Sequence, residues 1–308
     1  MGGLSETRQS AKQCLNGKGP GMSISYVKLP RDIVQVSGAD ARSFLQGLIS
    51  QDIDKVGPDL SAYGTLLTPQ GKYLHDFIIA QQNDHLLLDC EHGRGKDLAS
   101  RLSRFKLRAD VQLEHRDDDA VFVVFGRDAP EALDLESRTT ATRTHGRIVA
   151  MVDPRTADLG CRLIGPSGNI EALLTDRDIP EISPDAYDRL RISLQVPDGS
   201  RDLEIEKSIL LESNIDTLNG IDWNKGCYMG QELTARTKYR GLVKRGLVAF
   251  RSGTEPAQPG DPVLAGDKVV GEVRSTSGDL LLASVRLDAL ENGTPPLETA
   301  GKPLSRLS

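Results

Sequence analysis

The first half of the chain alternates hairpins of short apolar strands with amphipathic helices, and this alternation constrains the fold more than any other feature. The run from Ile33 to Val36 has the composition of a strand. From Ala41 to Ile49 apolar residues recur at the i, i+3, i+4, i+7 spacing of one helix face. The pattern predicts an α+β fold in which helices cover one face of a sheet. It lacks the regular strand–helix repeat and the glycine-rich loop of a dinucleotide-binding fold.

Two hairpins are predicted from turn residues between apolar runs, and two further helices are predicted, the first from the spacing of Leu98, Leu102 and Phe105. One hairpin joins residues 77–79 to 86–88 across Asn83-Asp84, and a second joins 111–113 to 121–125 across three aspartates. Ser183 followed by Pro184 is a strong helix start, because serine caps the helix and proline suits its first position.

Length and a change of composition near residue 245 predict several domains. The chain has 308 residues, more than the roughly 250 at which a single core usually stops growing. Residues 1–23 are polar and glycine-rich and are expected to be a disordered extension. Residues 24–244 are expected to form an α+β region of two subdomains. In residues 245–308 short apolar runs alternate with Gly, Pro and Asp, which indicates a β-barrel.

Charge and cysteine usage narrow the class of protein. The net charge of −6 argues against broad nucleic-acid binding. No apolar run approaches the ~20 residues that span a bilayer, so no membrane partner is expected. Cys14, Cys90, Cys161 and Cys227 form no CxxC pair, which favours free thiols in a reducing compartment such as the cytoplasm. Neither these cysteines nor the five scattered histidines predict a metal site within the chain.

The segment with the strongest chemical signal is Lys225-Gly-Cys-Tyr-Met-Gly-Gln-Glu232. Its cysteine, Cys227, lies between two glycines, which let a ligand approach the backbone closely. Lys225 and the N-terminus of a helix expected from Gln231 would favour the thiolate. The alternative is a small buried residue in a tight turn, since free cysteine is often buried. The other cysteines lack such surroundings and are expected to be structural.

The run KGCYMGQELTAR (225–236) resembles the signature of YgfZ-like proteins. Further stretches resemble blocks of that family in the same order, from about residue 25 onward. They are ARSFLQGLIS (41–50), TPQGK (68–72), KLRA (106–109), Asp153-Pro154-Arg155 and YRGLVKR (239–245). The resemblance implies the fold of the glycine-cleavage aminomethyltransferase superfamily. In that fold a multidomain ring, with a C-terminal β-barrel, surrounds a central channel that holds tetrahydrofolate.

The resemblance also implies site residues. Cys227 matches the key cysteine of the family, and Lys225 is expected to assist it in catalysis. The residues expected to bind the folate are Asp76, Glu212, Tyr228, Gln231, Glu232, Arg236 and Arg240. The transferases carry a pair of aspartates in the channel, and here the first of that pair is His75, which leaves the pair incomplete and puts acid catalysis of methylene transfer in doubt.

The function implied by the resemblance is a tetrahydrofolate-binding factor that uses Cys227 to assist assembly or repair of [4Fe–4S] clusters. Its partners would be assembly and client proteins, in the mitochondrial matrix if the chain is eukaryotic. One alternative is a folate-dependent aminomethyl or one-carbon transferase. Another is an accessory protein of tRNA modification, using the cations between Lys238 and Arg245. Those cations also suit a folate glutamate tail, an anionic partner or a solvated strand face.

Overall fold

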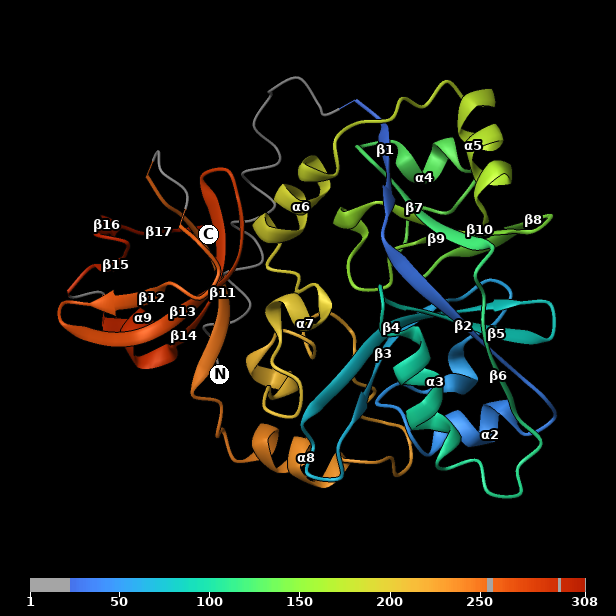
Figure 1. Cartoon of the computed structure of the whole chain (residues 1–308), viewed down its shortest axis with the longest axis horizontal. Coiled ribbons are helices and arrows are strands. Elements are labelled where there is room, and N and C mark those ends of the chain that lie inside the picture. Colours follow the sequence, from blue (N-terminus) through green and yellow to red (C-terminus); the bar gives the residue numbers. More distant parts are fainter. Residues whose placement is uncertain (1–22, 254–256, 293–294, 308) are drawn as a thin grey trace.

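The computed structural model describes residues 23–253, 257–292 and 295–307. Predictions about the N-terminal extension up to residue 22, including Cys14, lie outside the described residues. The described strands form three antiparallel sheets. In Figure 1 two sheets lie on the right and the third, the C-terminal sheet, lies on the left, with helices α6 and α7 between them. Within the described residues, no helix has the length and apolar character needed to cross a membrane.

The first sheet combines strands from distant parts of the chain. Its order is β1-β7-β10-β9-β8. The strands are β1 (Ser25–Leu29), β7 (Asp119–Phe125), β10 (Cys161–Pro166), β9 (Ile148–Val152) and β8 (Thr142–His145). Helices α4 (Ala129–Ala132) and α5 (Ser167–Asp176) contribute to the core on the outer face of this sheet.

The second sheet is formed mainly by the region of predicted strand–helix alternation. Its order is β3-β4-β5-β2-β6. The strands are β3 (Ala62–Leu67), β4 (Tyr73–Gln82), β5 (His85–Glu91), β2 (Arg31–Ser37) and β6 (Gln112–His115). Helices α2 (Ala41–Gln46) and α3 (Gly95–Ser103), with the short η1 (Ile53–Lys55), cover its outer face. The predicted helix over 41–49 is therefore shorter than its apolar spacing indicated.

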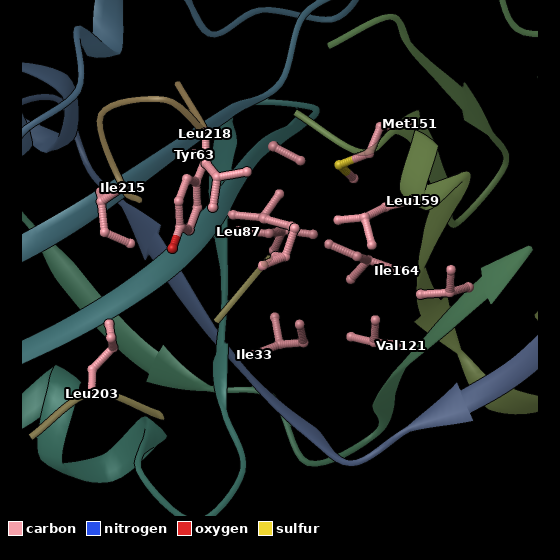
Figure 2. Packing of buried hydrophobic residues seen from close by; sticks show 14 of the residues in the cluster. Ile33, Tyr63, Leu87, Val121, Met151, Leu159, Ile164, Leu203, Ile215 and Leu218 are labelled. Atoms are coloured by element: carbon pink, nitrogen blue, oxygen red, sulfur yellow. The ribbon is translucent and has the colours of Figure 1, made fainter. Parts of the chain in front are cut away.

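The inner faces of these two sheets pack against each other. Figure 2 shows Ile33 and Leu87 from the second sheet beside Val121 and Ile164 from the first. Each sheet thus has helices on one face and the other sheet on its opposite face. The prediction of one sheet covered on a single face was incomplete, because the second sheet buries the remaining apolar face.

The prediction of a second hairpin, between residues 111–113 and 121–125, was wrong. Strand β6 pairs with β2, whereas β7 pairs with β1 and β10, so the aspartates between them connect two different sheets. The first hairpin is confirmed as β4–β5, with Asn83 at a positive φ in its turn. Composition marked a turn in both places, but only the competition among distant strands decides which edges pair.

A linker of helical turns leads from the two sheets to the third sheet. It contains α6 (Pro184–Ser193), α7 (Gly199–Asp202), η3 (Leu210–Glu212) and α8 (Gln231–Tyr239), whereas the short η2 (Ala157–Leu159) joins β9 to β10 within the first sheet. The predicted start of α6 is confirmed, since the Ser183 hydroxyl accepts a hydrogen bond from the Asp185 N–H. Helix α6 also contacts β13 and β14 of the third sheet.

The third sheet is a nearly closed barrel of order β16-β15-β12-β13-β14-β11-β17. Its elements are β11 (Arg245–Arg251), β12 (Pro262–Ala265), β13 (Lys268–Ser277), β14 (Leu280–Arg286), α9 (Leu287–Asn292), β15 (Leu297–Thr299), β16 (Lys302–Pro303) and β17 (Ser305–Arg306). A separate apolar cluster that includes Val248, Phe250 and Val273 forms its core.

Candidate functional site

Cys227 lies exposed on the loop that precedes α8. The other two cysteines of the described part of the chain, Cys90 and Cys161, are buried in strands β5 and β10. Burial raises the pKa of each of these two thiols to about 12. Among the described cysteines, Cys227 alone is placed where a partner molecule can reach its sulfur.

Lys225 anchors the loop that carries Cys227. Its side chain is only 8% exposed, and Nζ donates to the carbonyl oxygens of Gln46 (2.9 Å), Ile49 (2.7 Å) and Gln51 (2.7 Å). Burial lowers the pKa of this ammonium group to about 8. Lys225 therefore acts as a positioning residue, and its assistance to the thiol stays a prediction.

Further bonds join the same loop to residues 46–55. The Met229 N–H donates to the Gly47 carbonyl (3.2 Å) and the Asp222 N–H to the Ser50 carbonyl (3.0 Å). Lys55 forms an ion pair with the Asp222 carboxylate. These bonds hold the family-like stretch at 41–50 against the loop that carries Cys227, although about 175 residues of chain separate the two.

Two glycines let the β3–β4 turn, which carries the family-like stretch at 68–72, pack against the start of α8. Gly230 precedes α8 with φ 83°, and Gly71 lies in the β3–β4 turn with φ 68°. A Cβ on Gly230 would lie 2.7 Å from the Thr68 carbonyl oxygen, and one on Gly71 would lie 2.9 Å from the Gly230 oxygen. Because any side chain would separate these backbones, glycine at both positions lets the turn rest against the start of α8.

Tyr228 points into the core beside the cysteine loop. It belongs to the apolar cluster between the two sheets, and its hydroxyl has no hydrogen-bond partner among the described residues. Burial raises the pKa of Tyr228 to about 12, so the hydroxyl is protonated at neutral pH. A buried hydroxyl without a partner costs free energy, and a bound molecule with a polar atom would remove that cost.

Asp216, Trp223 and Lys238 contact one another in a cluster that we call the clamp, which was not predicted from the sequence. Asp216 accepts a hydrogen bond from Trp223 Nε1 (2.6 Å) and pairs with Lys238 Nζ (3.5 Å). The Lys238 ammonium also lies 3.8 Å from the centre of the Trp223 ring, a cation–π contact. The single tryptophan, four residues before Cys227, was the only sequence signal that could have indicated this clamp.

Some of the cations that follow Cys227 in the chain bond to other residues of the protein, and others do not. Lys238 belongs to the clamp, and Arg245 donates to the side chain and carbonyl of Ser284. Arg236, Arg240 and Lys244 are exposed, and none forms an ion pair with a carboxylate of the described residues. These three cations are therefore available to an anionic ligand or partner. Of the remaining predicted residues, Gln231 is half-buried and Glu232 is exposed, both in the first turn of α8.

The neighbours His75 and Asp76 face different sides of their sheet. Asp76 accepts hydrogen bonds from the hydroxyls of Tyr63 (2.9 Å) and Tyr73 (2.7 Å), which lie in the core between the sheets. His75 Nε2 instead lies 3.0 Å from Asp97 Oδ2 in α3. The expected channel pair is therefore split, since Asp76 alone faces the inner core.

The stability of the protein is expected to fall when the pH drops from about 6.5 to about 4, because of His75. Its side chain is 1% exposed. Burial and the nearby Arg94 lower its pKa to about 4, while Asp97 opposes that shift. In this range the unfolded chain binds the proton and the folded chain does not, so stability decreases as the pH falls.

The free energy of unfolding is expected to fall by about 3 kcal/mol, because the pKa of His75 is lowered from 6.5 to about 4 and each pKa unit corresponds to about 1.4 kcal/mol. Urea unfolding of wild type and of His75→Gln, at several pH values between 7 and 4.5, measures it. The glutamine variant can still donate to Asp97 but does not titrate, so its curve should be flatter. Identical pH dependence in the two proteins would contradict this assignment.

Glu212 has different surroundings from Asp76. Its Oε1 atom accepts hydrogen bonds from the N–H groups of Lys244 (2.9 Å) and Arg245 (3.2 Å), where the barrel begins. It lines a pocket of about 150 Å³ together with Arg245 and Arg274. Drug-sized ligands usually occupy about 300 Å³ or more, so this pocket is too small for a whole ligand of that size.

A buried charged network lies between the two sheets. Asp89 accepts hydrogen bonds from Arg31 Nε (2.7 Å) and Arg162 Nη1 (2.6 Å). The family-like block at 153–155 joins this network, because Asp153 pairs with Arg155 at 2.7 Å and with Arg162 at 3.5 Å. Arg155 also lies over the Tyr63 ring at 5.8 Å from its centre. Charged groups so deeply buried need such mutual pairing.

The described residues contain no group of three or more His, Cys, Asp or Glu side chains that could hold a metal ion. Cys227 thus lies exposed on a firmly anchored loop, and three cations without ion-pair partners among the described residues follow it in the chain. This geometry leaves the Cys227 thiol accessible from solvent.

The fold is that of the aminomethyltransferases of glycine cleavage. The crystal structure of glycine cleavage system aminomethyltransferase T from Bartonella henselae superposes with a TM-score of 0.76, covering 92% of this chain and 85% of that one. The sequence identity is 17%, so the likeness establishes the fold alone. A family model described as CAF17, C-terminal beta-barrel domain, matches residues 244–306.

Sequence relatives specify the family. The human iron-sulfur cluster assembly factor IBA57, mitochondrial, is 31% identical over 278 residues, covering 82% of this chain and 74% of the human protein. The mouse protein of that name is 30% identical, covering 85% and 77%. The Neurospora crassa homolog is 32% identical, and the matched region covers 75% of this chain but only 55% of that protein. The chain belongs to the IBA57 family, which refines the predicted YgfZ-like class. The relatives' names place them in mitochondria, as predicted for a eukaryotic member.

Proposed function

We propose that this chain assists the assembly of iron–sulfur clusters and that Cys227 is the group that contacts the cluster or the protein receiving it. The exposure of Cys227 on an anchored loop carries the proposal, because the other described thiols are buried. The names of the relatives, which are iron–sulfur cluster assembly factors, support it.

In this proposal the cluster is cargo and not a resident cofactor of the chain. Iron–sulfur clusters normally bind four protein ligands, and Cys227 supplies one. The remaining ligands would come from a partner protein or a small thiol, so that Cys227 binds only during transfer. In this step the Cys227 thiolate replaces one thiolate ligand of the iron, the leaving thiolate takes up the proton that Cys227 gave to solvent, and no oxidation state changes.

Rescue of cells that lack their own homologue tests this function. The wild-type chain, sent to the compartment of the missing protein, should restore the activity of a [4Fe–4S] enzyme such as aconitase. The amount of aconitase protein, measured in parallel, separates cluster assembly from expression. Failure of the well-expressed chain to raise aconitase activity would contradict the proposed function.

We further propose tetrahydrofolate as a ligand. Asp76 and Tyr228 contribute to one buried region, and a carboxylate that accepts one bond on each oxygen retains further acceptor positions. With the unpaired Tyr228 hydroxyl, these groups suit the polar ring of a folate. Arg236 and Arg240 suit its anionic glutamate tail. The pocket near Glu212 is lined by neither Asp76 nor Tyr228 and is smaller than the whole molecule, so it could hold at most a part of the ligand.

Replacing Tyr228 with phenylalanine is expected to separate ligand binding from folding. The variant loses a buried hydroxyl without a partner, so the free energy of unfolding should stay within about 1 kcal/mol of wild type or rise. Binding of tetrahydrofolate, measured by calorimetry, should weaken about tenfold, the value of one hydrogen bond of about 1.4 kcal/mol. Equal affinity in both proteins would exclude Tyr228 from the site. Absence of binding by wild type would exclude the ligand.

The two alternative functions, a folate-dependent aminomethyl or one-carbon transferase and an accessory protein of tRNA modification, stay predictions.

A further inference from the structure

We propose that the loop of residues 104–108, which we call the Leu107 loop, is a docking site for a protein that presents an apolar pocket surrounded by carboxylates. The loop follows α3 and overlaps the family-like block at 106–109. The proposed role of Cys227 leaves this block unexplained. The inference goes beyond that function and does not depend on the chemistry of the thiol.

Leu107 is displayed to solvent at the centre of the loop. Its side chain is 91% exposed, and Phe105 nearby is 43% exposed. Single exposed apolar residues are common on protein surfaces, but this one also has an unusual backbone. Its φ is +45°, in the left-handed region where a residue with a Cβ is disfavoured.

The fold itself gains nothing from the Leu107 side chain. The turn is closed by backbone hydrogen bonds from Lys106 to Ser103 (3.2 Å) and from Ala109 to Lys106 (2.8 Å). Glycine would form the same turn without strain. A strained, exposed leucine thus costs free energy that no contact within the described chain recovers. Strain of this kind is concentrated at functional sites.

The charges around Leu107 specify the chemistry of the partner. Arg104 and Arg108 are exposed and Lys106 is half-buried, and none forms an ion pair with a carboxylate of the described residues. Arg101, one turn earlier on α3, does pair with Asp97 at 2.9 Å. The loop therefore carries three unneutralised cations on a chain whose net charge is −6. An acidic surface complements it.

The leucine favours a protein over a nucleic acid as the partner. Phosphate groups would bind the three cations but would leave the aliphatic side chain exposed. A protein pocket can bury the leucine while carboxylates at its rim pair with the cations. This arrangement of an apolar centre and a polar rim is typical of protein interfaces.

The first test asks whether Leu107 serves folding. Leu107→Gly removes the side chain and the strain, so its Tm should stay within about 2 °C of wild type or rise. Val269→Gly is the matched control, because Val269 is exposed (66%) but lies in barrel strand β13. A fall in Tm for Leu107→Gly larger than that for Val269→Gly would show that Leu107 stabilises the fold and would overturn the proposal.

The second test asks what Leu107 contacts. A photoreactive benzoylphenylalanine is placed at position 107, or at position 269 as control, in the full chain expressed in cells. After irradiation, mass spectrometry identifies the crosslinked protein and the crosslinked residue. The benzoylphenylalanine at position 107 should crosslink to an apolar pocket bordered by Asp and Glu side chains on one partner protein. Arg104→Glu with Arg108→Glu should lower the yield about tenfold, as expected when about 1.4 kcal/mol of charge pairing is lost.

Several outcomes would overturn the proposal. They are no adduct at position 107, equal labelling from position 269, an adduct with nucleic acid, an adduct with a second copy of this chain, and a yield unaffected by the charge reversal. The same labelling is repeated with Cys227→Ala and should be unchanged. Crosslinking does not require cluster assembly, so failure of the proposed function and failure of the docking site are distinguished.

Discussion

Replacing Cys227 with alanine is expected to abolish rescue of [4Fe–4S] enzyme activity, with a loss of at least about tenfold relative to wild type. The sulfur is the only part of this side chain that can bind iron, and alanine has no substitute for it. The variant should fold normally because the residue is exposed and its loop is anchored by Lys225 and the backbone. Aconitase activity, divided by the amount of each protein, measures the effect.

Cys161→Ala is the matched control for this experiment. It also removes one thiol, but from a fully buried position in β10, and should cost about 1 kcal/mol of stability through the small cavity it leaves. It should nevertheless rescue aconitase activity. Full rescue by Cys227→Ala would show that the exposed thiol is dispensable, whereas equal failure of both variants would indicate loss of folded protein.

Replacing Asp89 with alanine is expected to lower the free energy of unfolding by about 3–5 kcal/mol, the usual cost of removing one partner from a buried ion pair. Asp89 is fully buried and accepts hydrogen bonds from Arg31 and Arg162. Without it, two buried guanidinium groups lose a shared carboxylate between the sheets. The midpoint of urea unfolding, at an unchanged slope, measures the effect.

Asp279 provides the surface comparison. It also pairs with two arginines, Arg189 and Arg251, each at 2.6 Å, but all three side chains are partly exposed. Asp279→Ala should therefore change stability by less than about 1 kcal/mol. If Asp89→Ala were no more destabilising than Asp279→Ala, the charged network would not hold the two sheets together.

Local sequence patterns correctly indicated several elements. The Ser183-Pro184 start of α6, the hairpin across Asn83 and the helix from Gln231 are all present. Each depends on residues close together in the chain, namely a cap, a turn or the spacing of apolar side chains. The resemblance of the blocks around Cys227 indicated the fold correctly, and the 0.76 TM-score agrees with it.

Only the tertiary structure decided which partners these local elements meet. Strands β6 and β7 join different sheets although a turn-like segment connects them. Lys225 binds carbonyl oxygens 174 to 179 residues away, and His75 faces α3 while Asp76 faces the inner core. The physical reason is that secondary structure follows from neighbours in the chain, whereas pairing, burial and charge neutralisation depend on groups that approach only when the whole chain has packed.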